Sequence, residues 1–219
     1  LKLIFLISAA AFIIGLLFTI KLPNPIQEKE LKPGTTRNVI SKNKFLFLSL
    51  LLRHIGAAAV WVILPIMIME KWGGDLYHIS VVYVANTLTA FILMNVMASK
   101  IHLSNITKFK IGIGATTFVF VGLAFVTDWW MAMPFMSLVG ATWAFLFIGG
   151  NFHLMENNPR STSTGIFSST LSIATVIGPI VGGTIAFLFD YVAVLYFAVA
   201  IIVCAFVVSL KIENKKILS

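Results

Sequence analysis

Residues Phe45–Met69 read FLFLSLLLRHIGAAAVWVILPIMIM, an apolar stretch that is interrupted only by Arg53 and His54. A helix that crosses the hydrocarbon core of a bilayer needs about 20 predominantly apolar residues, so this stretch predicts a transmembrane helix. Six further stretches pass the same test: Leu3–Ile20, Ile79–Ala98, Ile111–Thr127, Trp129–Gly150, Ile166–Phe189 and Val192–Leu210. Because none alternates with the period of a β-barrel strand, we expect an all-α integral membrane protein with seven transmembrane helices.

The composition excludes other classes of protein. Of the 219 residues, 59% are hydrophobic and 11% are charged, whereas a soluble domain carries roughly a quarter charged residues. A soluble globule and a disordered chain are therefore excluded. The net charge of +8 comes from basic residues that lie between the apolar stretches, so we expect the lipid bilayer and not nucleic acid as a partner. The single cysteine, Cys204, excludes a disulfide framework and a cysteine-based zinc site, and we expect neither a metal nor a cofactor.

The positions of Lys and Arg predict the orientation in the membrane. Connections on one side carry 13 of these residues, and connections on the other side carry only Lys71. Basic loops face the cytoplasm, so we expect a multi-pass protein of the cell membrane with a cytoplasmic C-terminus and with Leu1 outside. The polar stretch Lys21–Lys44 is the only long connection. The sequence therefore predicts one helix over residues 1–20, a basic cytoplasmic linker over 21–44 and a six-helix domain over 45–219.

A short motif near the C-terminus adds to this topology. Asn158-Pro159-Arg160 leads through a Ser/Thr run into Gly165, and Gly178-Pro179-Ile180-Val181-Gly182-Gly183 follows. With the topology, this motif resembles the C-terminal half of a major facilitator superfamily transporter. The resemblance implies that Leu3–Ile20 is the sixth helix of that family, that 21–44 is its central linker, and that helices seven to twelve follow. It also implies a missing N-terminal half as a partner, a small-molecule substrate and transport by alternating access.

The distribution of polar residues agrees with the resemblance. In this family the seventh, eighth, tenth and eleventh helices approach the central cavity, and the ninth and twelfth face lipid. Ile111–Thr127 and Val192–Leu210, the stretches in the ninth and twelfth places, contain no charged, amide or imidazole side chain. The family's Gly-x-x-x-Asp-Arg loop signature is only weakly present at Asn95–Lys110, where Ser99 precedes Lys100. How this loop contacts its neighbours is left open.

Eight residues are candidates for a substrate cavity or for coupling: Arg53, His54, Trp61, Tyr83, Asn86, Thr87, Trp143 and Ser169. A charge at the depth of Arg53 is costly, so we expect it to bind an anion or to reach the interface by snorkelling. His54 can titrate near neutral pH or serve in packing. Tyr83, Asn86 and Thr87 share a helix face that can line a cavity or bond a neighbouring helix, and the two tryptophans can stack on a substrate or pack in the core.

A second group of residues favours close helix packing and bending: Pro65, Gly178, Pro179, Gly182 and Gly183. Small residues permit close helix approach, and a proline removes one backbone hydrogen bond. A similar Gly-Pro element stands in drug–proton antiporters, so drug or metabolite efflux is one interpretation. All eight acids lie outside the predicted helices. Proton coupling would therefore need an acid in the missing half, or His54.

Two alternatives to a transporter stay open. A complete seven-helix receptor-like protein fits the topology, although the long inner linker after the first helix is unusual for one. An intramembrane enzyme is less favoured, because the chain has neither a Gly-x-Ser-x-Gly elbow nor a His-Glu-x-x-His pair. We therefore expect no catalytic residues.

Overall fold

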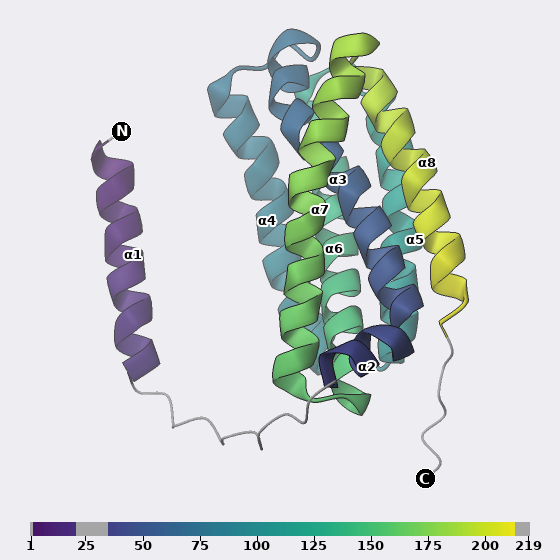
Figure 1. The fold of residues 1–219 in the computed structure, drawn as a ribbon. Helices are drawn as coiled ribbons and strands as arrows, with labels where there is room; N and C mark the ends of the chain where they lie inside the picture. Colours follow the sequence, from purple (N-terminus) through teal and green to yellow (C-terminus); the bar gives the residue numbers. More distant parts are fainter. Residues whose placement is uncertain (1, 21–34, 213–219) are drawn as a thin grey trace. The chain divides into compact units, whose positions relative to one another are not determined.

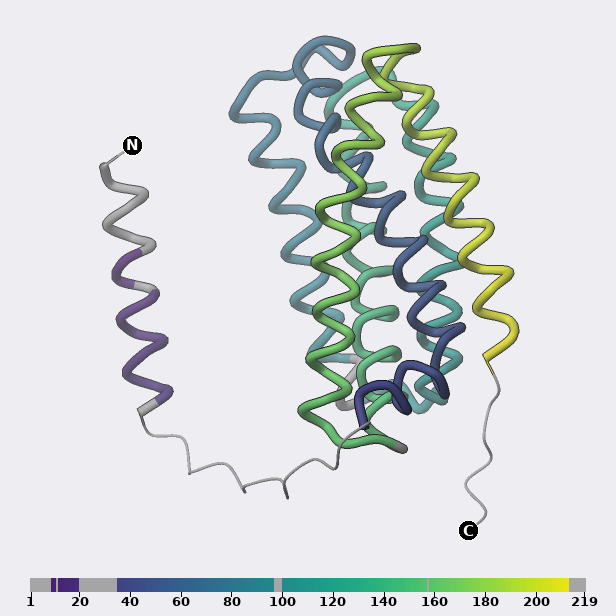
Figure 2. The backbone as a smooth tube through the Cα atoms, viewed as in Figure 1, coloured from purple at the N-terminus to yellow at the C-terminus, as the bar shows by residue number. Residues whose placement is uncertain are grey.

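The computed structural model describes residues 2–20 and 35–212, without the side chains of residues 2–8, 11, 20, 97–99 and 157. Figure 2 traces the backbone from the N-terminus to the C-terminus. By its internal contacts the chain forms two units, Leu1–Thr35 and Thr36–Ser219. The first contains helix α1 (Lys2–Ile20), where the sequence predicts the Leu3–Ile20 helix. Residues 21–34 of the predicted linker lie outside the described residues.

The second unit contains the remaining helices, except that Thr35, the first residue of α2, is counted with the first unit. They are α2 (Thr35–Lys42), α3 (Lys44–Glu70), α4 (Leu76–Ser99), α5 (Asn105–Leu123), α6 (Trp129–Asn157), α7 (Arg160–Leu188) and α8 (Tyr191–Leu210). The helices α3 to α8 are long and apolar enough to cross a membrane, by length and composition. The all-α class is thus confirmed for the described residues, whereas a seventh spanning helix stays a prediction. Helix α2 lies in the predicted linker, and its Val39 is buried in the core of the second unit.

Three helices extend six or seven residues beyond the apolar stretches that predict them, and one of these, α7, begins at Arg160 instead of Ile166. Helix α5 begins at Asn105 instead of Ile111, because the Ser104 side chain accepts a hydrogen bond from the backbone N–H of Thr107 and so caps the helix. Helix α6 continues past Gly150 to Asn157. Hydropathy marks only the part of a helix that suits the bilayer core, and a helix can continue where its polar side chains meet water.

The six long helices pack in a pattern that repeats (Figure 1). Helix α3 packs along α7 and α8, and α6 packs along α4 and α5; α5 and α8 also meet, while α3 touches α4 and α6 touches α7 only slightly. If α3, α4 and α5 are matched with α6, α7 and α8, in that order, the list of helix pairs in contact stays nearly the same. Because each set holds three helices of alternating direction, the second set runs opposite to the first, which is the pattern of an inverted repeat.

Glycines permit the closest of these contacts. A Cβ added at Gly182 of α7 would lie 2.5 Å from the backbone carbonyl oxygen of Ala59 in α3. A Cβ at Gly140 of α6 would collide with the Asn86 carbonyl of α4. Membrane helices gain little hydrophobic free energy from pairing in lipid, so close van der Waals contact between small residues has to hold them together.

The helices differ in how far they are buried. In its most apolar window, α3 is 67% buried and α5 is 50% buried, but α4 is only 11% and α7 only 17% buried. The resemblance places the ninth helix, which corresponds to α5, toward lipid. In the structure α5 is instead among the most buried helices, because it packs between α6 and α8. Helices α4 and α7 are the least buried of the six.

Candidate functional site

Arg53 lies inside the bundle and not at its end. Its side chain is 2% exposed, and its Nη2 donates a hydrogen bond to the Thr116 hydroxyl of α5 at 3.2 Å. The Thr116 hydroxyl in turn donates to the Gly112 carbonyl oxygen at 2.6 Å. The guanidinium carbon is 5.6 Å from the centroid of the Trp143 ring. Among the described residues no carboxylate pairs with Arg53, and its Nε is buried without a hydrogen-bond partner. Snorkelling therefore does not describe its position.

A row of four rings, which we call the aromatic row, starts beside Arg53. The ring centroids of His54 and Trp143 are 5.5 Å apart, those of Trp143 and Phe147 are 5.4 Å apart, and those of Phe147 and Phe167 are 5.7 Å apart. The row connects α3 through α6 to α7. The His54 Nδ1 is buried and has no hydrogen-bond partner, whereas Trp143 and Phe147 are half-buried. The aromatic row thus provides flat, partly accessible surfaces next to polar nitrogen atoms.

Pro65 frees a backbone carbonyl that Tyr83 then satisfies. In an α-helix the N–H of residue 65 would donate to the carbonyl of Trp61, but proline has no N–H. The Tyr83 hydroxyl of α4 donates to this carbonyl oxygen at 3.2 Å, and the Tyr83 and Trp61 rings lie 4.7 Å apart. Tyr83 therefore bridges α4 to α3 at the place where α3 lacks one of its own hydrogen bonds.

The other candidate residues on α4 and α7 lie either at a contact between helices or on the outer surface. The Asn86 side-chain nitrogen donates to the Met136 carbonyl oxygen of α6 at 3.1 Å, which is an interhelical bond. Thr87 is exposed, and its hydroxyl donates within its own helix to the Tyr83 carbonyl at 3.0 Å. Ser169 of α7 is also exposed. The shared wall of Tyr83, Asn86 and Thr87 is therefore divided between two neighbouring helices and the outer surface.

Helix α7 has two unlike faces. Its buried face includes Gly178, where an added Cβ would lie 2.5 Å from the Ala58 Cβ of α3, and Gly182 one turn later. Gly183 points elsewhere, because a Cβ there would meet nothing within 4 Å. The exposed side of α7 carries large apolar residues such as Ile173, Val176 and Ile180. Beside them runs a stripe of small and polar exposed residues, which we call the α7 outer stripe: Gly165, Ser168, Ser172, Thr175 and Gly183. Pro179 lies within α7, half-buried, between the two faces.

Charged groups gather where the connection between α3 and α4 lies beside the connection between α7 and α8. The Lys71 ammonium lies 3.4 Å from the Asp190 carboxylate, and the Tyr191 hydroxyl donates to Glu70 at 2.9 Å. The Ala193 backbone N–H donates to the Asp190 carboxylate at 2.7 Å. This hydrogen bond, assisted by the charge of Lys71, lowers the pKa of the Asp190 carboxyl. These exposed contacts fix a loop and contribute little to stability.

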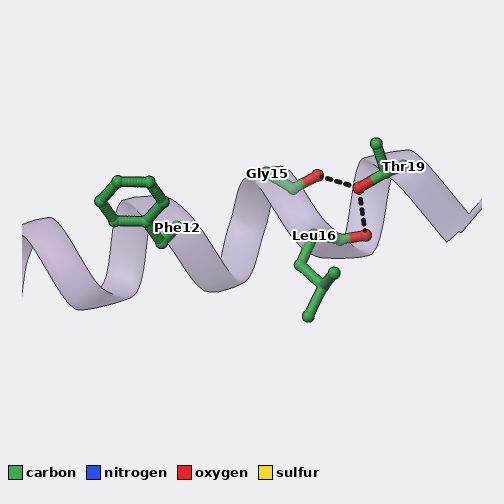
Figure 3. Close-up of a pocket in the computed structure, with 4 residues that line it drawn as sticks. All are labelled: Phe12, Gly15, Leu16 and Thr19. Carbon is green, nitrogen blue, oxygen red and sulfur yellow. Dashed lines mark hydrogen bonds between the residues drawn. The ribbon is translucent and has the colours of Figure 1, made fainter.

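Neither a metal site nor the pocket on α1 adds to the chemistry of the described residues. Among the described residues, no group of three or more His, Cys, Asp or Glu side chains could hold a metal ion. In the first unit, a shallow pocket on α1 is lined by Phe12, Gly15, Leu16 and Thr19 (Figure 3). The Thr19 hydroxyl donates within the helix to the carbonyl oxygens of Gly15 and Leu16. The pocket therefore presents no free polar group.

Sequence reasoning missed three residues of this site. Thr116 lies in a stretch that reads as featureless and lipid-facing, yet it is completely buried and holds Arg53. Phe147 and Phe167 are two of 19 phenylalanines, so nothing in their local sequence distinguishes them. The spacing Gly112-x-x-x-Thr116, small residues one turn apart, is the one signal that favours a packed face there.

No family model and no curated protein matches the chain.

Proposed function

We propose that the chain is the C-terminal half of a secondary transporter of the major facilitator type, which moves a small solute by alternating access. In this proposal the six-helix unit forms one half of the transport pathway. The other half is an N-terminal partner with which it rocks about a shared site. The cell membrane is the proposed location, with the C-terminus in the cytoplasm.

The repeated packing of the six long helices supports this proposal most. Secondary transporters are commonly built from inverted repeats, with the substrate site at the repeat interface near the middle of the membrane. Here α3 and α6 take equivalent places, each packed against two helices of the other set. The residues at this junction include Arg53, His54 and Trp143.

The exposed helices supply the second support. Helices α4 and α7 are the least buried of the six, and each packs closely along only one other helix, α4 along α6 and α7 along α3. The α7 outer stripe is small and polar, although a surface that faces only lipid is best served by large apolar side chains. Such a stripe suits close contact with another helix or with a water-filled pathway.

The chemistry of the site favours a solute with a flat or apolar part. The aromatic row offers stacking surfaces, and His54 and Arg53 place nitrogen donors beside it. Drug or metabolite efflux fits this combination. No described carboxylate lies at the site, so a proton carrier would have to come from the N-terminal half or from His54.

Reconstitution in liposomes tests the proposal. The 219-residue chain alone should give no uptake above empty vesicles of three probes: an aromatic cation dye, a radiolabelled sugar and an organic anion. Joined to the segment encoded upstream of Leu1, it should transport at least one of them. Robust uptake by the chain alone would show that it is not half of a transporter.

A matched pair of tryptophans tests the site in the joined protein. Trp143→Ala removes the ring that contacts both Arg53 and His54, so the transport rate should fall at least tenfold. Trp130 lies in the first turn of the same helix and is 59% exposed. Trp130→Ala should therefore leave the rate within twofold. Equal effects of the two changes would argue against a substrate site at the aromatic row.

A further inference from the structure

Three lysines lie around the place where α3 begins and α8 ends: Lys44 at the start of α3, Lys110 in α5 and Lys211 directly after α8. The ammonium groups of Lys44 and Lys211 lie 5.2 Å and 5.7 Å from the centroid of the same Phe45 ring. The Lys110 ammonium of α5 donates to the Ile212 carbonyl oxygen at 3.0 Å, directly after Lys211. We call Lys44, Lys110 and Lys211 the basic cluster.

Among the residues that the structure describes, the basic cluster has no negative partner. Within residues 35–212, no carboxylate forms an ion pair with any of the three lysines. In the described part of the chain, their ammonium groups contact the ring of Phe45 and one backbone carbonyl. Like charges that gather without a counterion repel one another, and an anion placed among them would relieve this repulsion.

Apolar surface lies immediately deeper in the bundle. Leu48, one turn further along α3, is 43% exposed, and Val207 and Leu210 in the last turns of α8 are 55% and 56% exposed. These helices are long and apolar enough to cross a membrane, so the basic cluster lies at the level of the lipid headgroups. A cationic site above exposed apolar side chains matches one ligand class: a molecule with an anionic head and hydrocarbon chains.

We propose that the basic cluster binds the headgroup of an anionic phospholipid. The lipid phosphate accepts hydrogen bonds and charge from Lys44, Lys110 and Lys211, and the acyl chains lie along Leu48 and Leu210. Free phosphate would gain the same charge contacts but would leave the apolar surface unused, so the lipid is the favoured source of the phosphate. This site is independent of the proposed transport function.

Native mass spectrometry of the chain in detergent tests the site. We expect phosphatidylglycerol to bind more tightly than phosphatidylcholine of the same acyl chains. A juxtamembrane basic residue contributes about 1 kcal/mol to binding an anionic surface, which is about fivefold in the dissociation constant. Lys44→Gln with Lys211→Gln should therefore weaken phosphatidylglycerol binding about 25-fold and leave phosphatidylcholine binding unchanged. The charge-preserving pair of Arg substitutions should restore it.

Lys100 provides the matched control, because it is exposed and lies at the C-terminal end of α4, away from the basic cluster. Lys100→Gln should change phosphatidylglycerol binding less than twofold. Equal losses in Lys100→Gln and in the double variant would mean non-specific attraction, and unchanged binding in the double variant would overturn the site. The parent chain gives a second measurement that needs no variant: phosphatidylglycerol should raise its unfolding temperature more than phosphatidylcholine does. An equal rise with inorganic phosphate would assign the site to a free anion and overturn the lipid proposal.

Discussion

Two neighbouring glycines of α7 should respond in opposite directions to the same substitution. Gly182 faces α3, where an added Cβ would lie 2.5 Å from the Ala59 carbonyl oxygen and 2.8 Å from the Ala59 Cα. Ordinary contacts of a Cβ begin at 3.4 Å. Because the colliding atoms belong to the backbone, no side-chain rotation can relieve the clash. In Gly182→Ala, α7 and α3 must therefore separate by roughly 1 Å.

The magnitude follows from two opposing terms. Overpacking at a close contact typically lowers the unfolding free energy by about 1–3 kcal/mol. Because the added Cβ collides with backbone atoms, we take the upper end of this range, about 3 kcal/mol. Replacing a helical glycine by alanine raises the unfolding free energy by about 1 kcal/mol, because alanine has the higher helix propensity. Gly182→Ala should thus lose about 2 kcal/mol of unfolding free energy. In Gly183→Ala the added Cβ meets nothing within 4 Å, so only the propensity term acts and stability should rise by about 1 kcal/mol.

Thermal unfolding of the detergent-solubilised chain measures the pair. For a protein of this size, 1 kcal/mol shifts the midpoint by roughly 2–4 °C. The midpoint of Gly182→Ala should therefore fall by about 4–8 °C, and that of Gly183→Ala should rise by about 2–4 °C. If both alanines raise the midpoint, α3 and α7 do not meet at Gly182, and the repeated packing of the bundle is wrong at this contact.

Three further changes test the site and the loops. Arg53→Met should leave stability unchanged or raise it by about 1–3 kcal/mol in the same unfolding assay, because it removes a buried charge that has no counterion; a loss above about 2 kcal/mol would refute this. Tyr83→Phe should cost about 1–3 kcal/mol by orphaning the Trp61 carbonyl, but much less in a Pro65→Ala background that restores the helical N–H; equal costs in both backgrounds would rule out the bridge. Asp190 has a lowered folded-state pKa, so its contribution is fully present above the unfolded-state pKa of about 4 and is lost as the pH falls through the folded-state pKa. Asp190→Asn should therefore flatten the stability profile below about pH 4, and an unaltered profile would contradict the lowered pKa.

The small burial of α4 and α7 has a consequence for the proposed transporter. A substitution of Gly183 by a large residue should not lower the stability of the 219-residue chain, since the position faces open space within it. If the α7 outer stripe meets an N-terminal half, the same change would impair the joined protein. A single substitution would then impair the joined protein without destabilising the 219-residue chain.

The sequence alone determined the all-α class and the places of the six long helices. Apolar runs of bilayer length can satisfy their backbone hydrogen bonds in lipid only as helices, so hydropathy is enough to find them. It was less exact at the ends: α5 begins at Asn105 because Ser104 caps it, and a cap is a local hydrogen bond that hydropathy does not report. The helix α2 was missed for a related reason, since Val39 is one apolar residue in a polar stretch and its burial depends on the bundle that covers it.

Only the tertiary structure decided which faces meet. Arg53 reads as an isolated charge, and its partner Thr116 lies 63 residues away on a helix that looks lipid-facing. Gly182 and Gly183 read as equivalent, yet one touches α3 and the other faces open space. The physical reason is the same in each case. Within lipid, helix pairing is decided by close steric fit and a few hydrogen bonds, and these depend on the rotation of each helix against its neighbours, which hydropathy does not encode.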